Sequence, residues 1–460
     1  MTAATPHLRS GPHVEIYTAH RAGLHRRKRP WEVALVLALL CISGDPVALR
    51  PLGHDVTYAA AAALLIGALL LRRTGPAVRA FVPVASVFVV LSLVHAYAFD
   101  FLPIITDAGF LTRLFVGMAV VVMVSHLART YVTALVGLSL LSFVFWAPEY
   151  IASRSGIRFH YVFAALADRL GPQTDVQWSL GFHTYMVNPE QMHRNAGIFW
   201  EPGAFAGYLI IAILMLAAIR PSLTRKQHLA ALCILTAALL STFSTAGYIA
   251  YPVALLLNYD WRGVNRANRA RIAFGICVIA PVVMFASYYA FSNLDFLQAK
   301  IGRQVTAVER HERGWRTDRI GTLVFDWQYI SKRPLTGWGL NFRTRFALTP
   351  WARDDSKKMG NGMFNFLAQF GVIGFGTFLL GLGRGANRIG GNSRGYVLGF
   401  ITSVLLVLQG EPYLNYPLFL GLMFLGHAPV GGQRLPRFHQ IETGSSMPVR
   451  CCPQLQPTES

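Results

Sequence analysis

The sequence predicts an all-α fold: a polytopic helical membrane protein of about twelve transmembrane helices with two large extracytoplasmic loops. Of its 460 residues, 53% are hydrophobic and only 14% are charged, whereas soluble globular proteins carry roughly 25% charged residues. Apolar runs of the roughly 17 to 25 residues that cross a bilayer recur along the chain, and the mean hydropathy is +0.40. The loops between alternate runs are basic, as cytoplasmic loops are.

The predicted spans follow one another from the end of the basic N-terminal tail. They lie near 31–49, 56–71, 81–98, 109–126, 131–147, 203–219, 228–240, 245–257, 272–291, 362–382, 396–408 and 414–425. The apolar stretch from His228 to Leu257 is too long for one span. Its centre, STFST at Ser241–Thr245, marks either a turn between two short helices or a break at membrane depth that lines a cavity.

Loop charge predicts that both termini are cytoplasmic. With the N-terminus inside, every predicted cytoplasmic loop is basic, whereas the three short outer loops together contain one arginine. This alternation follows the rule that positive residues stay on the inner side. The chain then divides into a basic cytoplasmic tail at 1–30, a membrane domain at 31–428 and a disordered cytoplasmic tail at 429–460.

The charge and the cysteines exclude several classes of partner. The net charge of +20 is concentrated in the loops, where it sets orientation, so we do not expect nucleic acid as a partner. Three of the five cysteines lie in apolar segments and two in the C-terminal tail. They form neither a disulfide framework nor a metal-binding spacing, and we expect no metal and no cofactor.

The two large outer loops are predicted near 149–201 and 292–361. Loops of this length are functional or disordered, and their aromatic residues favour order. In the second loop, apolar residues recur at helical spacing between 301 and 315, and the opposite face carries Arg303, Arg310 and Arg313. This helix either lies on the outer headgroups or offers a basic surface to an anionic substrate. His311 is its single histidine and is either solvated or in contact with that substrate.

Arg194 and Glu201 are the first candidate functional pair. They flank an aromatic stretch, RNAGIFWEPGAFA, at the outer mouth of a predicted span. Charges at the edge of the hydrocarbon region are costly unless they are paired or hydrated. A structural ion pair combined with a helix start at Glu201 and Pro202 is the alternative interpretation.

Two further segments carry candidates at the end of the second outer loop. Arg319 opens a mostly apolar, helix-compatible stretch that leads into the elbow KRPLTGWGLNF, which contains Pro334, Gly337 and Gly339. Such Pro and Gly spacing marks a turn. Asn361 stands where the chain re-enters the membrane, where an ordinary helix N-cap is the alternative to a substrate contact.

Two lesser candidates lie near other predicted outer ends. Arg113 is expected near the outer end of an apolar segment, where snorkelling to the interface is the simpler explanation. Glu411 repeats the Glu-Pro dipeptide at the last outer turn. His183 and His193 do not have the spacing of metal ligands.

The order of these motifs resembles the O-antigen polymerase and ligase superfamily of membrane enzymes. Arg194, Gly197, Phe199, Glu201 and Pro202 match the family's Arg-x-x-Gly-x-Phe-x-Glu-Pro stretch. The resemblance covers roughly residues 194–375 together with the overall topology.

The later motifs extend the resemblance, with two departures. Arg319 is followed fifteen residues later by Pro-Leu-x-Gly-x-Gly, as in the family, and GNGMFNFLAQFGVIGF resembles its re-entering segment. In the ligase branch that segment starts with His-Asn, whereas here Gly360 precedes Asn361, which favours the polymerase branch. A tryptophan common after the loop arginine is also absent, and Leu323 stands near its place.

The resemblance implies a metal-independent glycosyltransferase that moves a glycan from an undecaprenyl diphosphate carrier to an acceptor sugar. Arg194, Glu201 and Arg319 would be catalytic: the arginines would neutralise the leaving diphosphate, and the glutamate would act as a base or orient an arginine. Substrate-binding residues would be Arg113, His311, Arg313, Asn361 and Glu411. The implied place is the periplasmic face of the bacterial inner membrane, with membrane lipid, a chain-length regulator and a flippase as partners.

Three functions stay open at this point, beside a structural or interaction role, which does not need a paired Arg and Glu at the mouth of a span. The first is a polymerase of O-antigen, capsular or exopolysaccharide repeat units, and the second is a ligase-type transferase with a different acceptor. The third is a transporter of a polysaccharide or lipid-linked solute, which predicts charged residues midway through spans. In the sequence, the charged candidates instead lie at outer ends and in outer loops.

Overall fold

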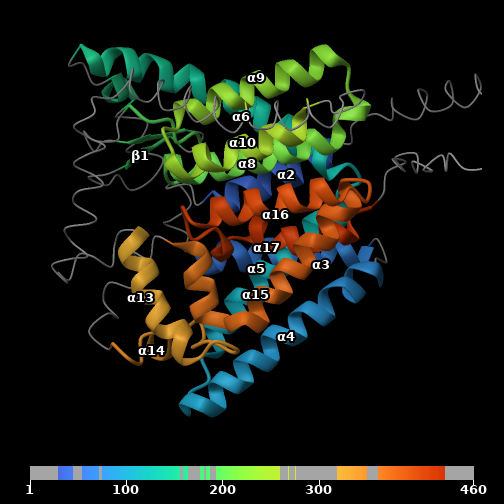
Figure 1. Ribbon diagram of the computed structural model, residues 1–460, viewed down its shortest axis with the longest axis vertical. Helices are drawn as coiled ribbons and strands as arrows, with labels where there is room; N and C mark the ends of the chain where they lie inside the picture. The colour runs from blue at the N-terminus through green and yellow to red at the C-terminus, as the bar shows by residue number, and fades with distance from the viewer. Residues whose placement is uncertain are drawn as a thin grey trace, which may run out of the picture.

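The computed structural model describes residues 30–44, 54–71, 75–155, 159–163, 177–180, 183–186, 193–259, 319–349 and 361–429. Figure 1 shows these residues as a stack of helices, with a small hairpin at the upper left and helices α13 and α14 at the lower left. The helices are α2 Pro30–Ser43, α3 His54–Leu71, α4 Gly75–Phe99, α5 Ile104–Met123, α6 Leu127–Arg154, α8 Pro202–Ile219, α9 Arg225–Ser241, α10 Thr245–Asn258, α13 Arg319–Lys332, α14 Phe342–Arg345, α15 Gly362–Ile389, α16 Arg394–Leu408 and α17 Pro417–Gly421.

Short elements connect these helices. The 3-10 turns are η2 Phe159–Phe163, η3 Arg220–Ser222, η7 Tyr413–Asn415 and η8 Leu422–His427. Strands β1 Gln177–Ser179 and β2 Thr184–Met186 form an antiparallel hairpin in which Trp178 pairs with Tyr185.

The helices confirm a helical membrane protein but not the count of twelve spans. Within the described ranges, five helices are long and apolar enough to cross a bilayer, and they cover 77–99, 104–123, 127–152, 202–222 and 362–389. Four shorter apolar helices accompany them. The span expected near 414–425 is instead the broken series η7, α17 and η8, and the span expected near 272–291 lies outside the described residues.

Helix α8 forms the centre of the bundle. Its residues are apolar on every side. Of its most apolar 18-residue stretch, 89% is buried, as expected for a helix surrounded by other helices. It packs against α6, α9, α10 and α16. Because α8 meets protein on all sides, the residues at its start are held in a fixed environment.

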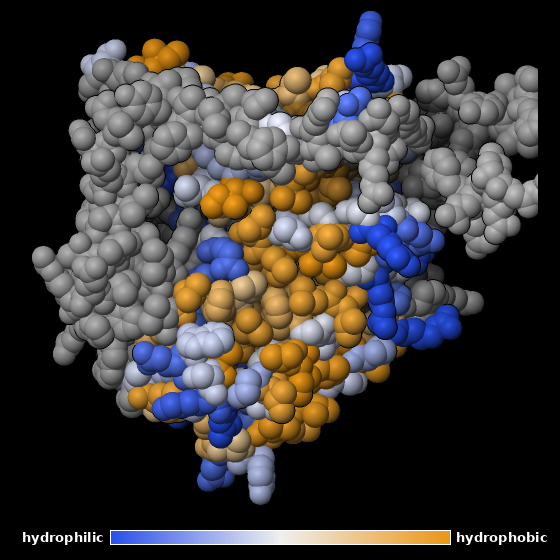
Figure 2. Space-filling view, in the orientation of Figure 1, coloured by the Kyte–Doolittle hydropathy of each residue, from blue (hydrophilic) through white to orange (hydrophobic). Residues whose placement is uncertain are grey.

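The outer helices present apolar side chains to their surroundings. Only 28% of the most apolar 18-residue stretch of α4 is buried. Its exposed residues include Val82, Val90 and Leu93. Figure 2 shows apolar side chains over much of the face in view, with polar side chains gathered toward its edges. In water such a surface would be unusual, whereas lipid tails cover it without cost.

The STFST segment is a turn between two helices. Helix α9 ends at Ser241 and α10 begins at Thr245, with Ser244 as its N-cap. Phe243 has a φ of 49°, which allows the sharp reversal between them. The first of the two interpretations from sequence is therefore confirmed.

The first large outer loop begins later than expected. Helix α6 continues through Glu149 to Arg154, past the predicted start of this loop near 149. Apolar and aromatic residues continue past Pro148 in the sequence, and proline does not end the helix because its ring disturbs only one turn. The expected amphipathic helix at 301–315 lies outside the described residues.

The elbow docks onto a break in α15. Gly371 interrupts that helix with a φ of 61°, and the freed backbone pairs with the elbow. Trp338 N donates to Ala368 O at 2.9 Å, and Val372 N donates to Pro334 O at 2.8 Å. A Cβ at Gly371 would lie 2.2 Å from Leu335 O, so only glycine permits this contact.

The elbow's own glycines serve the same contact. Gly337 and Gly339 have φ values of 72° and 82°, which favour glycine. Gly339 N donates to Gln369 O at 2.8 Å. The Gly-x-Gly spacing therefore sets the conformation that fastens α13 and α14 to α15 at one end of the bundle, at the lower left of Figure 1.

Candidate active site

The segment 194–201 forms a fixed turn at the start of α8. The Nδ2 of Asn195 donates to Ser142 Oγ of α6 and to Ser241 Oγ of α9, both at 2.9 Å. Its Oδ1 accepts a bond from Gly197 N at 3.0 Å. Gly197 has a φ of 56°, which explains the glycine. A fully buried asparagine therefore ties the segment to two helices.

The aromatic residues of this segment are internal anchors. The ring of Phe199 stacks on Tyr208 of α8 with centroids 4.3 Å apart. The ring of Trp200 stacks on Tyr416 at 4.5 Å. Both aromatic residues are buried, so they fix the segment against α8 and against the loop that follows α16.

Glu201 occupies the N-cap position of α8, and Pro202 is the first helical residue, as the sequence predicted. The side chain of Glu201 makes no capping hydrogen bond and is half-buried. Its carboxylate thus lies at the positive end of the α8 dipole but does not accept a hydrogen bond from the first turn of the helix. The backbone at Glu201 and Pro202 therefore starts the helix as predicted, but the Glu201 carboxylate does not cap it.

Arg194 is held at the turn between α9 and α10. Its Nε donates to Thr242 O at 3.0 Å, and the side chain is half-buried. Within the described part of the chain, no hydrogen bond or ion pair joins Arg194 to Glu201. The structural ion pair considered from sequence is therefore not formed, because the buried turn directs the two side chains to different neighbours.

Glu411 is the residue that meets Glu201. A Cβ on Gly203 would lie 2.7 Å from Oε1 of Glu411 and 3.5 Å from Oε1 of Glu201. Both carboxylates therefore border the same point on the first turn of α8. The side chain of Glu411 is only 9% exposed, so it approaches this point from inside the protein. The two Glu-Pro dipeptides, far apart in sequence, form one cluster of carboxylates.

The start of α15 closes the other side of this cluster. Asn361 caps α15, since its Oδ1 accepts from Phe364 N at 3.1 Å while its Nδ2 donates to Gln409 Oε1 at 2.8 Å. The backbone of Gly362 lies directly against Glu411 O. The N-termini of α8 and α15 therefore meet at the loop that carries Glu411. Their dipoles favour negative charge at this place.

Arg113 lies elsewhere than expected. Helix α5 begins at Ile104, five residues before the expected start at 109, so Arg113 is midway along the helix and not near its outer end. Its guanidinium lies 5.9 Å from the centroid of the Tyr58 ring. The earlier start follows from Pro103, which opens the helix. A mid-span arginine is the feature that the transporter hypothesis predicted.

The remaining candidates are only partly placed. Arg319 is the first residue of α13, which confirms the helical stretch, but its side chain lies outside the described part of the structure. His311, Arg313 and Gly360 also lie outside the described residues. The structure therefore brings together Glu201, Glu411 and the cap at Asn361, with Arg194 on the neighbouring turn.

Sequence reasoning missed a buried ion pair between α13 and α14. Nη2 of Arg345 donates to Oδ1 of Asp326, and the two side chains are 2% and 0% exposed. The guanidinium also lies 4.7 Å from the centroid of Tyr329 and 5.2 Å from that of Phe346. Burial raises the pKa of Asp326 to about 6, although the nearby Arg345 charge opposes the rise.

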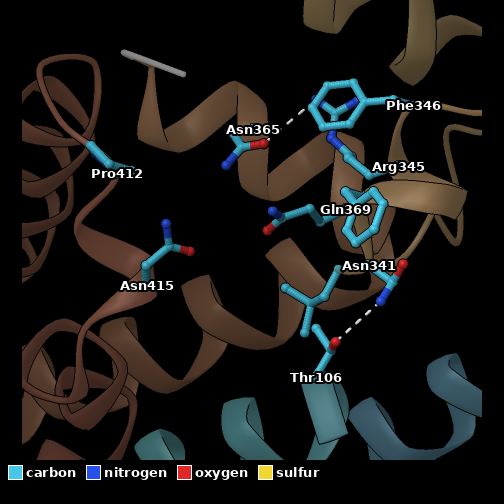
Figure 3. A pocket seen from close by; sticks show the side chains of 10 residues that line it. Thr106, Asn341, Arg345, Phe346, Asn365, Gln369, Pro412 and Asn415 are labelled. Carbon is cyan, nitrogen blue, oxygen red and sulfur yellow. Dashed lines mark hydrogen bonds between the residues drawn. The ribbon is translucent and has the colours of Figure 1, made fainter. Parts of the chain in front are cut away.

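A cavity of ≈ 320 Å³ lies beside this ion pair. It opens between α5, α14, α15 and the loop after α16, and Figure 3 shows its lining. The lining residues are Thr106, Leu340, Asn341, Phe342, Arg345, Phe346, Asn365, Gln369, Pro412 and Asn415. A volume near 300 Å³ is at the lower end of the range for ligand sites, about 300–1,000 Å³.

One sequence signal pointed to this cavity. Asn361, Asn365 and Gln369 follow one another at four-residue spacing in an otherwise apolar segment, which places their side chains on one face of a helix. Amide groups on one face of a membrane helix need a polar neighbour. We considered only the first of them as a candidate.

Residues 229–379 match a known protein family, described as O-antigen ligase. This match supports the resemblance of the chain to the O-antigen polymerase and ligase superfamily. The matched region runs from the start of α9 through the elbow and past the kink of α15, whereas the segment around Arg194 precedes it. No curated protein and no solved structure matches the chain. The match supports a membrane enzyme of the ligase and polymerase type.

Proposed function

We propose that this protein polymerises undecaprenyl-diphosphate-linked oligosaccharide repeat units into O-antigen, capsular polysaccharide or exopolysaccharide. The proposal rests mainly on one observation, the meeting of Glu201 and Glu411 at Gly203 beside the N-termini of α8 and α15. The family match supports the reaction type. The absence of histidine at Gly360 favours the polymerase branch over the ligase branch.

The proposed chemistry is a displacement at the anomeric carbon of the lipid-linked sugar. A hydroxyl oxygen of the acceptor glycan forms the new bond to that carbon, and the bond from carbon to diphosphate oxygen breaks. The electron pair leaves with undecaprenyl diphosphate. The hydroxyl proton passes to Glu201 or Glu411, because a carboxylate at hydrogen-bond distance can accept it.

The leaving diphosphate needs positive charge as it departs. Arg194 is held on the turn beside α8, where its Nε donates to Thr242 O at 3.0 Å. Arginine suits phosphate oxygens because of its planar fork. We assign this role to Arg194 and, by the family resemblance, to Arg319, and we propose that the reaction is metal-independent.

The proposed setting is the periplasmic face of the bacterial inner membrane, with both termini cytoplasmic and the full set of about twelve spans. Arg113, His311, Arg313 and Asn361 are proposed substrate contacts. A chain-length regulator and a flippase are proposed partners by analogy with the family.

A ligase is the second candidate, because the matched family is described as O-antigen ligase. The two functions differ in the acceptor: a polymerase extends a glycan, whereas a ligase transfers finished polymer to a lipid core. A deletion strain distinguishes them. Loss of a polymerase leaves single repeat units or no polymer, whereas loss of a ligase leaves polymer that is not attached.

The test is complementation of that deletion strain with wild type, Arg194→Ala, Arg194→Lys, Glu201→Ala and a control, Arg225→Ala. Arg225 is exposed at the start of α9, at the opposite end of that helix from Arg194. We expect the control to restore long polymer and the other variants to fail although they insert into the membrane. Normal polymer from Arg194→Ala and Glu201→Ala would contradict the proposal and favour the transporter.

A further inference from the structure

The cavity beside Arg345 contains amide groups that the protein itself does not satisfy. Asn365 and Gln369 are 7% and 8% exposed, and both line the cavity. Buried amides are hydrogen-bonded in nearly all proteins. Within the described residues, however, the Nδ2 of Asn365 and the whole side-chain amide of Gln369 have no hydrogen-bond partner. These amide groups can therefore form hydrogen bonds with a ligand that enters the cavity.

The unsatisfied groups converge on one space. Asn365 and Gln369 extend from the same face of α15, and Asn415 reaches the cavity from η7 on the opposite side. Figure 3 shows the three amides directed into the space between these elements. Each amide offers donors and an acceptor, so together they present a mixed set of hydrogen-bonding groups and no carboxylate.

The rest of the lining adds apolar surface. Phe342, Phe346, Leu340 and Pro412 border the same cavity. A ligand that fits must therefore carry many hydroxyl or amide groups around a body with apolar C–H faces. A sugar unit has this chemistry, and the mixed lining matches the usual composition of small-molecule sites.

Arg345 does not turn the cavity into an anion site. Its Nη2 is directed to Asp326 Oδ1 and lies 3.5 Å from Asn365 Oδ1. Nε and Nη1 of Arg345 are buried and have no hydrogen-bond partner within the described residues. Nη2 belongs to both forks of the guanidinium, so a phosphate or carboxylate bound in bidentate fashion would compete with Asp326 and Asn365 for it. Asp326 also balances the positive charge. A neutral ligand is therefore favoured over the diphosphate headgroup.

We infer that this cavity is a binding subsite for the uncharged sugar units of the glycan substrate. It adjoins the candidate catalytic carboxylates, because Pro412 and Asn415 of its lining belong to the same loop as Glu411. A glycan bound in the cavity would extend along the loop that carries Glu411 to reach the carboxylates of Glu201 and Glu411. This inference rests on the proposed function for the identity of the glycan, but binding is measurable without transfer.

Gln369→Met is the decisive variant. Methionine has nearly the shape of glutamine, and replacing an amide without a protein partner removes no internal hydrogen bond. We expect stability to stay at the wild-type value or to rise, while sugar affinity falls about tenfold, the loss typical of one hydrogen bond in a buried site. Arg343→Met is the matched control, because Arg343 is exposed on the same short helix and does not line the cavity.

The assay uses the purified full-length protein and fluorescently labelled short oligosaccharides, released by mild acid from the host strain's own polysaccharide. Fluorescence polarisation gives the affinity, and inorganic pyrophosphate serves as competitor. We expect Asn415→Leu to weaken binding as Gln369→Met does, and pyrophosphate to leave it unchanged. Unchanged affinity in Gln369→Met, a loss of its stability, or competition by pyrophosphate would each overturn the inference.

Glu201→Gln separates this inference from the proposed function. We expect it to bind the oligosaccharides as wild type does while it loses transfer. If wild type transfers nothing but its binding still depends on Gln369, the polymerase proposal fails and the subsite stands. If transfer proceeds but Gln369→Met binds and transfers as wild type does, the subsite fails alone.

Discussion

Gly203→Ala is a small change that should move one catalytic carboxylate without removing any charge. The new Cβ would lie 2.7 Å from Oε1 of Glu411, whereas ordinary contact begins near 3.4 Å. The carboxylate therefore has to retreat by about 0.7 Å. The atom in the way is the end of a flexible side chain, so the backbone of α8 does not need to shift.

The expected consequences for stability and activity differ, because stability should stay near the wild-type value whereas activity should fall. Alanine is favoured over glycine in helices by at most about 1 kcal/mol, which offsets the cost of moving the carboxylate. Misplacement of a catalytic group by about 1 Å costs roughly a hundredfold in rate. We therefore expect Gly203→Ala to insert and unfold like wild type and to make polymer about a hundredfold more slowly.

The assay is polymer formation by purified protein in liposomes, supplied with lipid-linked repeat units and read as a ladder on a gel. Gly137→Ala is the control, because a Cβ at that glycine of α6 meets nothing within 4 Å. Wild-type rates from Gly203→Ala would refute the reasoning that the position of the carboxylates matters. Slow transfer by Gly137→Ala would show that any glycine change in the bundle is harmful.

The remaining predictions concern the other features of the same end of the molecule. Glu411→Gln should lower transfer by about 10²–10⁴-fold, the range for loss of a general base, whereas the exposed control Asp100→Asn should transfer normally. Gly371→Ala should cost at least about 1–3 kcal/mol of unfolding free energy, because alanine is strained at its φ of 61° and its Cβ would clash with Leu335 O, and a denaturant titration measures this loss. Arg345→Met should cost about 3–5 kcal/mol because it strands a buried carboxylate, and a second change, Asp326→Leu, should restore most of it. Because the pKa of Asp326 is raised from 3.8 to about 6, the folded state holds its proton more tightly, so unfolding free energy should fall as pH rises from 3.8 through 6, a slope that Asp326→Asn should abolish.

Hydropathy and loop charge predicted the helical membrane fold because long apolar runs allow few alternatives in lipid. The helix starts at Pro202 and Gly362 were also predictable, since Glu-Pro and Asn are local N-terminal signals. Hydropathy does not distinguish a helix that crosses the bilayer from one that packs inside the bundle. The broken elements at 413–427 show this limit, because their residues are apolar but buried against protein.

The pairing of Glu201 with Glu411 was not predictable from sequence. Both residues were candidates, but their meeting depends on how the start of α8 approaches the loop after α16 that carries Glu411. The segment suggested an ion pair between Arg194 and Glu201, and the folded turn separates them. Proximity along the chain was misleading here because a buried asparagine, and not the charges, determines the conformation of the turn.

The cavity could be anticipated only in part. The amide spacing on α15 was visible in the sequence, but its partner Asn415 comes from a distant loop. The ion pair of Arg345 and Asp326 depends on the elbow, whose two left-handed glycines, together with Gly371 of α15, fasten α14 to α15. Such contacts between distant segments depend on the tertiary structure, and local sequence patterns do not predict them.

The most direct test of the central claim is the transfer rate of purified Glu201→Gln, Arg194→Lys and wild type in liposomes with lipid-linked repeat units and a metal chelator. We expect polymer from wild type despite the chelator and a loss of about 10²-fold or more in both variants. Wild-type rates in both variants would contradict the assignment of the active site, and a wild type that makes no polymer until metal is added would contradict the metal-independent mechanism.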